Sequence, residues 1–111
     1  MGALGATPTF AVAPGGNQSV LNITGTGVVV AAPCVLVRVT VQQQGSGAGL
    51  TINDASTSGG ASASNQFLNV AASSLTSGQV IKLEWPIKNG IVISSMPAGA
   101  VISLSFQTPP P

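Results

Sequence analysis

The amino-acid sequence predicts an all-β protein, in the form of a two-sheet antiparallel β-sandwich with about eight strands. Three observations support this: apolar and polar residues alternate in three separate segments, β-branched residues dominate, and glycine or proline recurs about every 8–12 residues. Such alternation is typical of strands with one buried and one solvated face. A single flat sheet of this size would leave an apolar face in water, so two packed sheets are expected. The pattern leaves both jelly-roll and immunoglobulin-like topologies open.

The alternation is clearest in residues 35–42, 81–85 and 100–106. In the first segment the four valines are expected to share one buried face, opposite Arg38 and the polar residues that follow it. In the second, an apolar trio that ends at Trp85 faces the core, and the charged residues between its members face water. The residues expected in the core are Val37, Val39, Leu83, Ile93, Ile102 and Leu104.

Short glycine-rich segments predict how the strands connect. Residues 45–49 predict a hairpin loop that joins strand 35–43 to strand 50–53. Asn89-Gly90 predicts a second hairpin, and with the Pro-Gly turn that follows, it makes the last third of the chain a three-stranded meander. The other strands are expected at 9–12, 19–23, 26–31, 66–70, 79–85, 91–95 and 100–106.

The chain divides into one domain and two short ends. Residues 19–106 are expected to form the β-sandwich, and residues 54–65 a long exposed loop within it, because they carry no large apolar side chain. Residues 1–18 are rich in glycine, alanine and proline and predict an extended N-terminal arm. Residues 107–111 predict a proline-rich C-terminal stub.

Charge is the outlier in the composition. Only Arg38, Asp54, Lys82, Glu84 and Lys88 are charged, or 5% of the 111 residues, where soluble domains carry about 25%. A net charge of +1 without clustered cations argues against nucleic acid as a partner. No apolar run approaches the roughly 20 residues of a membrane span, so no membrane is expected either. A weakly charged surface favours self-association, which predicts a homo-oligomer.

The sequence offers little material for catalysis. It has no histidine or tyrosine, and its two carboxylate side chains, Asp54 and Glu84, are interpreted as a turn residue and a surface charge. A nucleophilic serine would need Lys82 or Lys88 as its base, and neither has a recognisable setting. The single cysteine, Cys34, lies in an apolar segment and predicts a buried, unreactive thiol. We expect no enzyme activity, catalytic residue, cofactor, metal or small-molecule substrate, with a calcium ion on backbone carbonyls left open.

Trp85 is of the residue type that often marks a binding surface. Two interpretations stay open: an aromatic side chain at the edge of the core, in phase with Ile81 and Leu83, or a platform for a sugar or a partner protein. In the N-terminal arm, Phe10 and Val12 are apolar side chains suited to contact a neighbouring subunit. The candidate assembly interface therefore consists of Phe10, Val12 and Trp85.

Three features of residues 28–106 resemble the small virion proteins of tailed bacteriophages, in particular capsid decoration (cement) proteins. They are the strand 35–42 with its Gly/Ser turn into Leu50–Asp54, the unit Leu83–Ser94, and the terminal strand Ala100–Phe106. The resemblance, one of pattern and composition, implies a homotrimer in the virion that binds the major capsid protein on the capsid surface and stabilises the shell. The resemblance implies no active-site residues in this chain.

Two alternatives stay open beside this resemblance. The first is a β-sandwich associated with a phage tail, head–tail junction or fibre that binds a receptor or glycan. The second is a stand-alone secreted or cell-surface binding module.

Overall fold

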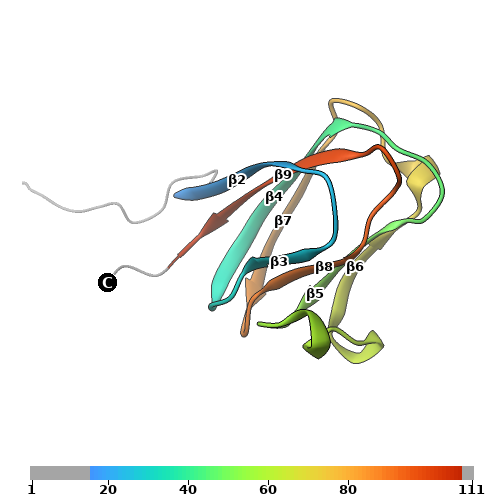
Figure 1. Ribbon diagram of the computed structural model, residues 1–111. Coiled ribbons are helices and arrows are strands. Elements are labelled where there is room, and N and C mark those ends of the chain that lie inside the picture. The colour runs from blue at the N-terminus through green and yellow to red at the C-terminus, as the bar shows by residue number, and fades with distance from the viewer. Residues whose placement is uncertain (1–15, 109–111) are drawn as a thin grey trace, which may run out of the picture.

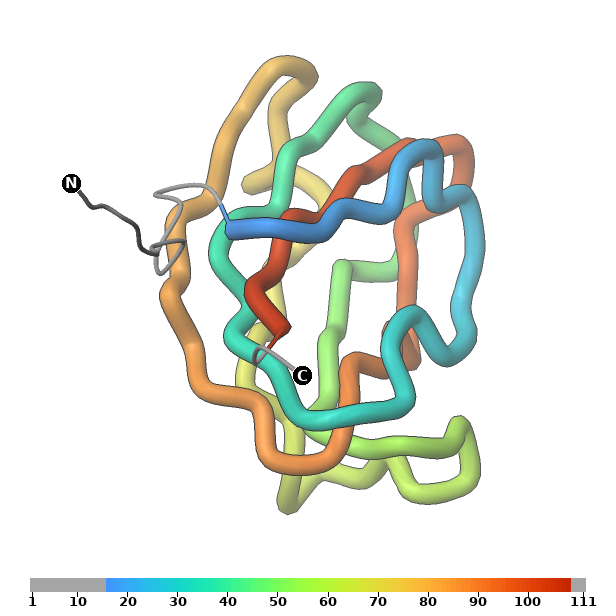
Figure 2. Tube along the Cα trace, turned by 90° about the vertical axis from the view of Figure 1, so that its left-hand side faces the viewer, coloured from blue at the N-terminus to red at the C-terminus, as the bar shows by residue number. Residues whose placement is uncertain are grey.

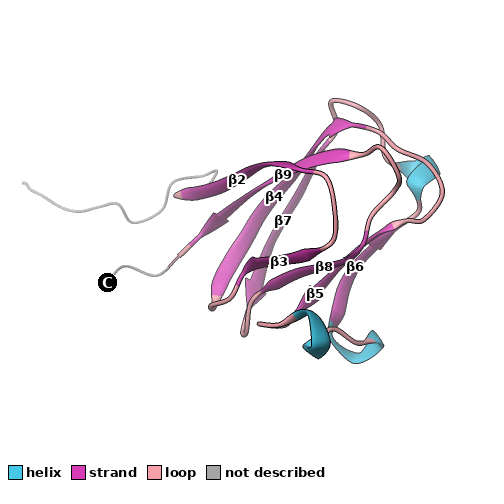
Figure 3. Ribbon diagram, viewed as in Figure 1, coloured by secondary structure: helices cyan, strands magenta, loops and turns pink. Residues whose placement is uncertain are grey.

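A computed structural model describes residues 16–108, which form two antiparallel four-stranded sheets packed face to face (Figures 1 and 3). This confirms the predicted all-β sandwich. The strands are β2 (Gln18–Ile23), β3 (Gly27–Val30), β4 (Cys34–Gln43), β5 (Leu50–Asp54), β6 (Gln66–Val70), β7 (Val80–Ile87), β8 (Ile91–Ser95) and β9 (Val101–Gln107). Two connections contain single turns of 3₁₀ helix: η1 (Ser58–Gly60) and η2 (Ala63–Asn65) lie between β5 and β6, and η3 (Ala72–Ser74) lies between β6 and β7. The strand expected at 9–12 lies outside the described residues.

The order of the described strands is that of a jelly roll. One sheet runs β2-β9-β4-β7 and the other β3-β8-β5-β6. Successive strands therefore alternate between the sheets, except β5 and β6, which are neighbours in one sheet. Immunoglobulin-like sandwiches instead keep strands A and B together in one sheet. Of the two topologies that the sequence leaves open, the structure adopts the jelly roll.

Both predicted hairpins are wrong. β4 and β5 belong to different sheets, as do β7 and β8, so the glycine-rich segments between them cross from one sheet to the other and the last third is not a meander. The surroundings of Gly90 explain why the Asn89-Gly90 dipeptide wrongly indicated a hairpin. A Cβ at this position would lie 2.4 Å from the carbonyl oxygen of Val30 and 2.6 Å from that of Ala55. Glycine is needed here because the backbones on either side of it in the same sheet approach closely, rather than for a hairpin turn.

The core fills the space between the two sheets. Five of the predicted core residues are buried, whereas Leu83, on the edge strand β7, is only half-buried. The apolar side chains larger than alanine that are at most 1% exposed come from the four inner strands: Leu36, Val39, Val41, Leu50, Ile52, Ile91, Val92, Ile93, Ile102 and Leu104.

Strand β4 departs from regular alternation. Its register with both neighbouring strands shifts between Leu36 and Arg38, and such a β-bulge changes the phase of the residues on either side of it. Leu36 therefore shares the core with Val39, both fully buried, while Val35 is half-buried. The prediction that four valines share one face is wrong, because the period-2 pattern does not reveal the bulge.

The two ends of the described chain lie together. β2 and β9 run side by side (blue and red in Figure 2). The Asn17 N–H donates to the Phe106 carbonyl oxygen at 3.0 Å, and the Thr108 N–H donates to Asn17 Oδ1 at 3.0 Å. Gln18, which the sequence places in the arm, is already the first residue of β2 and pairs with Phe106. The chain before residue 16 and the chain after residue 108 therefore start from one corner of the sandwich.

Candidate functional site

Trp85 is the one member of the candidate interface that lies within residues 16–108, since Phe10 and Val12 fall outside them. It lies opposite Leu36 of β4, and directly opposed residues share a face of the sheet, so its ring projects on the core side. Because β7 is an edge strand, the ring extends past the core and 45% of its surface is exposed. Trp85 thus lies at the edge of the core and also contributes to the surface.

The Trp85 ring packs on Phe67 of β6, the edge strand of the other sheet. The ring centroids are 5.7 Å apart and the ring planes differ by 7°. The stack joins the two sheets along their β6–β7 side. A pair of this kind contributes about 0.5–1.5 kcal/mol beyond the area that it buries.

Both strands that carry the stacked rings, β6 and β7, have a β-bulge at this point. In β6 the register shifts between Ile52 and Asn53 of its partner strand, which leaves Phe67 as the extra residue. In β7 the register shifts between the pairs formed by Lys82 and Trp85, and Glu84, which lies between them, has a positive φ of 51°. Bulges redirect side chains and are common beside functional sites.

Sequence reasoning missed Phe67 because its partner ring lies far along the chain, in the other sheet. The available signal was weak. Phe67 and Leu68 are adjacent apolar residues on one predicted strand, and strict alternation cannot bury both on the same face.

A pocket of about 420 Å³ opens beside this stack, between the ends of β5, β6 and β7. Phe67, Trp85 and Pro86 form its apolar part. Its polar rim consists of Asp54, Ser64, Asn65, Gln66, Lys88 and Asn89. The pocket therefore combines an exposed aromatic ring with amide, hydroxyl and charged groups, which is the composition of small-ligand sites.

Asp54 fixes the side of the rim formed by the connection from β7 to β8. Its carboxylate accepts hydrogen bonds from the backbone N–H groups of Lys88 at 2.9 Å, Asn89 at 2.8 Å and Gly90 at 3.4 Å. Partial burial acts to raise the pKa of Asp54, but these hydrogen bonds, with one from the Asn89 side chain, outweigh it and lower the pKa. The predicted turn residue is thus the last residue of β5, and it organises a turn distant in sequence.

Asn53 fixes the opposite side of the rim. Only 2% exposed, it donates from Nδ2 to the Ser62 carbonyl oxygen and to Asn65 Oδ1, both at 2.8 Å. Its Oδ1 accepts from Ser94 Oγ at 2.6 Å. Asn65 in turn accepts from the Ser62 N–H at 3.0 Å and donates to the Gly60 carbonyl oxygen at 2.8 Å. The connection between β5 and β6 is therefore tied to the interior by one buried amide.

This connection, residues 54–65, was predicted as a long exposed loop. Most of its residues are exposed, as predicted, but it begins within β5 and contains η1 and η2. A run of small polar residues carries no hydrophobic periodicity, so its hydrogen-bonded order could not be read from the pattern.

Replacing Asp54 by asparagine is expected to lower the free energy of unfolding at pH 7 by about 1–2 kcal/mol, because the backbone donors lose a charged acceptor. Since the folded-state pKa is lowered, the contribution of the carboxylate is present above the ordinary value of about 3.9 and is lost as the pH falls through the folded-state pKa. Urea unfolding at pH 7, 4 and about 2.5 should show this acid loss in the wild type and in Glu84→Gln, but much less in Asp54→Asn. Equal acid sensitivity in all three proteins would contradict the assignment.

Cys34 is buried, as predicted, with 6% of its surface exposed. Burial, with the negative charge of Asp54 as a smaller cause, raises the pKa of the Cys34 thiol to about 11. The thiol is therefore protonated at neutral pH and is a poor nucleophile.

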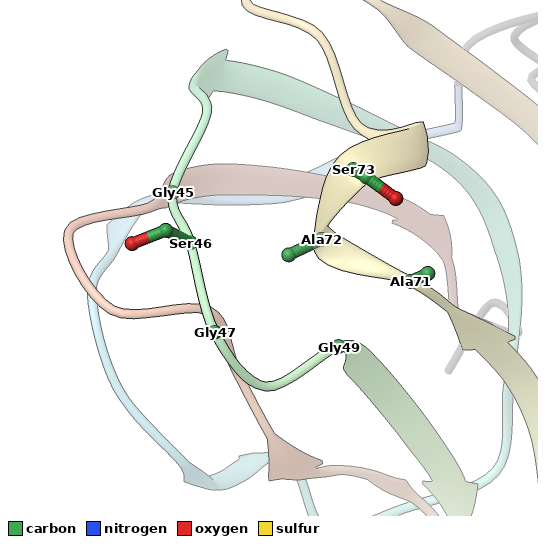
Figure 4. Close-up of a pocket in the computed structure, with 7 residues that line it drawn as sticks. All are labelled: Gly45, Ser46, Gly47, Gly49, Ala71, Ala72 and Ser73. Carbon is green, nitrogen blue, oxygen red and sulfur yellow. The ribbon is translucent and has the colours of Figure 1, made fainter.

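A second pocket, of about 350 Å³, lies at the other end of β5, where Gly49 precedes the strand. Only glycine, alanine and serine line it. Figure 4 shows the Ala72 methyl group directed towards the segment of Gly45 to Gly47, while the Ser46 hydroxyl points away from Ala72. This pocket offers neither charge nor an aromatic surface, so the pocket beside Trp85 is the candidate functional site.

Among residues 16–108, no three His, Cys, Asp or Glu side chains gather closely enough to hold a metal ion. The helices in this part of the chain are all too short to cross a membrane. Comparison of the chain with protein-family models, with curated proteins and with solved structures finds no significant match.

Proposed function

We propose that this chain is a non-enzymatic structural protein of a bacteriophage virion, a decoration protein that binds the major capsid protein on the outside of the head and stabilises the shell. The jelly roll agrees with such a role, since this architecture recurs in viral capsid domains. Because one fold serves many functions, the proposal depends mainly on the surface of this particular sandwich.

The observation that carries the proposal is where the exposed apolar side chains lie. Within the described chain, the large hydrophobic residues with the greatest exposure are all on edge strands: Leu21 at 65% on β2, Val28 at 44% on β3, and Val80 at 48% and Trp85 at 45% on β7. Edge strands carry unpaired backbone groups that can pair with another chain. Apolar side chains at the same edges favour burial of those edges against another protein.

The scarcity of charge supports the same role. With charged residues at 5% of the chain, an interface on this surface would desolvate few ions, which are the costliest groups to bury. Attachment would be driven by apolar and backbone contacts, so an increase in salt concentration should weaken it little.

A homotrimer is the assembly that we propose, since cyclic symmetry lets identical copies cover one another's edges. The hydrogen bonds between Asn17 and Thr108 hold both ends of the described chain at one corner. The predicted N-terminal arm and C-terminal stub would therefore reach the same neighbouring surface, and Phe10 and Val12 would supply apolar contacts there.

Deletion of residues 1–12 is expected to leave the sandwich folded while it weakens attachment to heads by about tenfold or more, because the arm's contacts are lost. The measurement is co-sedimentation of the purified protein with heads that lack it, at low and high salt, with light scattering for the oligomeric state. Leu21→Asp should also weaken attachment, whereas Ser58→Asp, which places the same charge outside the edge strands, should not. A stable monomer that does not sediment with heads would refute the proposal.

A further inference from the structure

The pocket beside Trp85 has an aromatic surface that no other side chain of the described residues fully covers. Phe67 lies parallel to one face of the indole ring. Because the ring centroids are 5.7 Å apart, the two rings are offset, and Phe67 leaves indole surface uncovered within the 45% of Trp85 that is exposed. An indole face held rigidly by a stacked neighbour is a platform for a flat apolar ligand surface.

Hydrogen-bonding groups surround this platform. Within residues 16–108, the side chains of Gln66 and Lys88 line the pocket and have no hydrogen-bond partner. An amide supplies two donors and an acceptor, and an ammonium group three donors. The Asp54 carboxylate already accepts from three backbone N–H groups and the Asn89 side chain, so it contributes to the shape and charge of the rim.

The charge of the rim argues for a neutral ligand. One cation, Lys88, and one anion, Asp54, line the pocket, so their charges cancel. A phosphate-bearing ligand would call for clustered cations, and a lipid chain would call for a deeper apolar cavity than one ringed by amides and hydroxyls.

We propose that this pocket binds a pyranose ring of a neutral glycan. The C–H groups on one face of a sugar ring form an apolar surface that packs on the exposed indole surface of Trp85. The hydroxyls around the ring both donate and accept hydrogen bonds, which matches the free amide of Gln66 and the ammonium group of Lys88. The pocket's volume of about 420 Å³ lies in the range of roughly 300–1,000 Å³ found for small-ligand sites.

The rim is already in place before a ligand arrives. Asn53 and Asn65 hold one side through hydrogen bonds of 2.8 Å, and Asp54 holds the other. Preorganised groups lose less entropy when a ligand binds. A single sugar in a site of this size should nevertheless bind weakly, with a dissociation constant on the order of millimolar.

The test uses Trp85 as its own reporter, because it is the single tryptophan of the chain. The isolated protein is titrated with methyl glycosides of glucose, galactose and mannose and with N-acetylglucosamine, and it is also applied to a glycan array. At least one sugar should shift the Trp85 emission saturably. By saturation-transfer NMR, Trp85→Ala should abolish binding and Gln66→Ala should weaken it about fivefold or more, while Val80→Ala, an exposed residue on the same strand, should not change it.

Several results would overturn the glycan assignment. The first is a glycan array on which the wild-type protein gives no signal above that of the Trp85→Ala variant. The second is sugar binding that persists in a folded Trp85→Ala variant. The third is a Trp85 emission that changes with protein concentration but not with sugar concentration. Saturable binding of a proline-rich peptide without any sugar binding would reassign the pocket to peptides. Since every measurement uses the isolated protein, the outcome is independent of whether the protein attaches to heads.

Discussion

Replacing Asn53 by alanine is expected to lower the free energy of unfolding by about 3 kcal/mol or more, because a single change leaves several buried groups without partners. Asn53 is 2% exposed and bonds to Ser62, Asn65 and Ser94. Each buried polar group left unsatisfied costs about 1–3 kcal/mol. Asn53→Asp keeps the shape of the side chain but turns carboxylate oxygens towards the oxygen acceptors of Ser62 and Asn65, so it should be comparably destabilising.

Chemical unfolding of the purified variants measures this effect. Asn69→Ala is the matched control, since Asn69 is exposed on β6 and accepts one hydrogen bond of 3.3 Å from Thr51 Oγ1. It should cost less than about 1 kcal/mol. If Asn53→Ala were no more destabilising than Asn69→Ala, the buried amide would not be what holds the connection between β5 and β6.

Leu104→Ala is expected to lower the free energy of unfolding by about 2–4 kcal/mol, through lost burial and the cavity that remains. Leu104 is 1% exposed and belongs to β9, an inner strand that pairs with both β2 and β4. Its surroundings come from both sheets of the core cluster, and close-packed neighbours of this kind collapse only partly into a cavity.

The same substitution at an exposed leucine provides the control. Leu21, on β2, is 65% exposed, so Leu21→Ala should change the free energy of unfolding by less than about 1 kcal/mol. Thermal and denaturant unfolding of both variants should therefore differ clearly. Equal losses would mean that the assigned strand phase of β9 is wrong.

The fold class could be predicted because alternation reports directly on burial. Ile102, Leu104 and Phe106 all face the core, as the pattern of β9 predicts. The pairing of strands could not be predicted in the same way. Gly90 and its neighbours mark a change of direction, but they do not tell whether the chain returns along the same sheet or crosses to the other. That choice depends on contacts between distant segments, such as those of Asp54 with the turn at residues 88–90.

The candidate site was only partly visible in the sequence. Trp85 stands out by residue type, and its position at the core edge follows from the alternation of β7. Its stacking partner Phe67 and the anchoring residue Asn53 could not be identified, since neither carries a distinctive local pattern. Both depend on a β-bulge or on buried hydrogen bonds, which form only when segments that are distant in the sequence come together.

The location of the protein in purified phage particles tests the central claim most directly. Electron cryo-microscopy of particles with and without the protein, together with its selective removal from isolated heads, would establish where it binds. We expect density for a trimeric β-sandwich on the outer surface of the head, and heads that lose it should withstand less heating. Particles whose heads carry no such density, or in which the protein is found only at the tail, would contradict the proposed function.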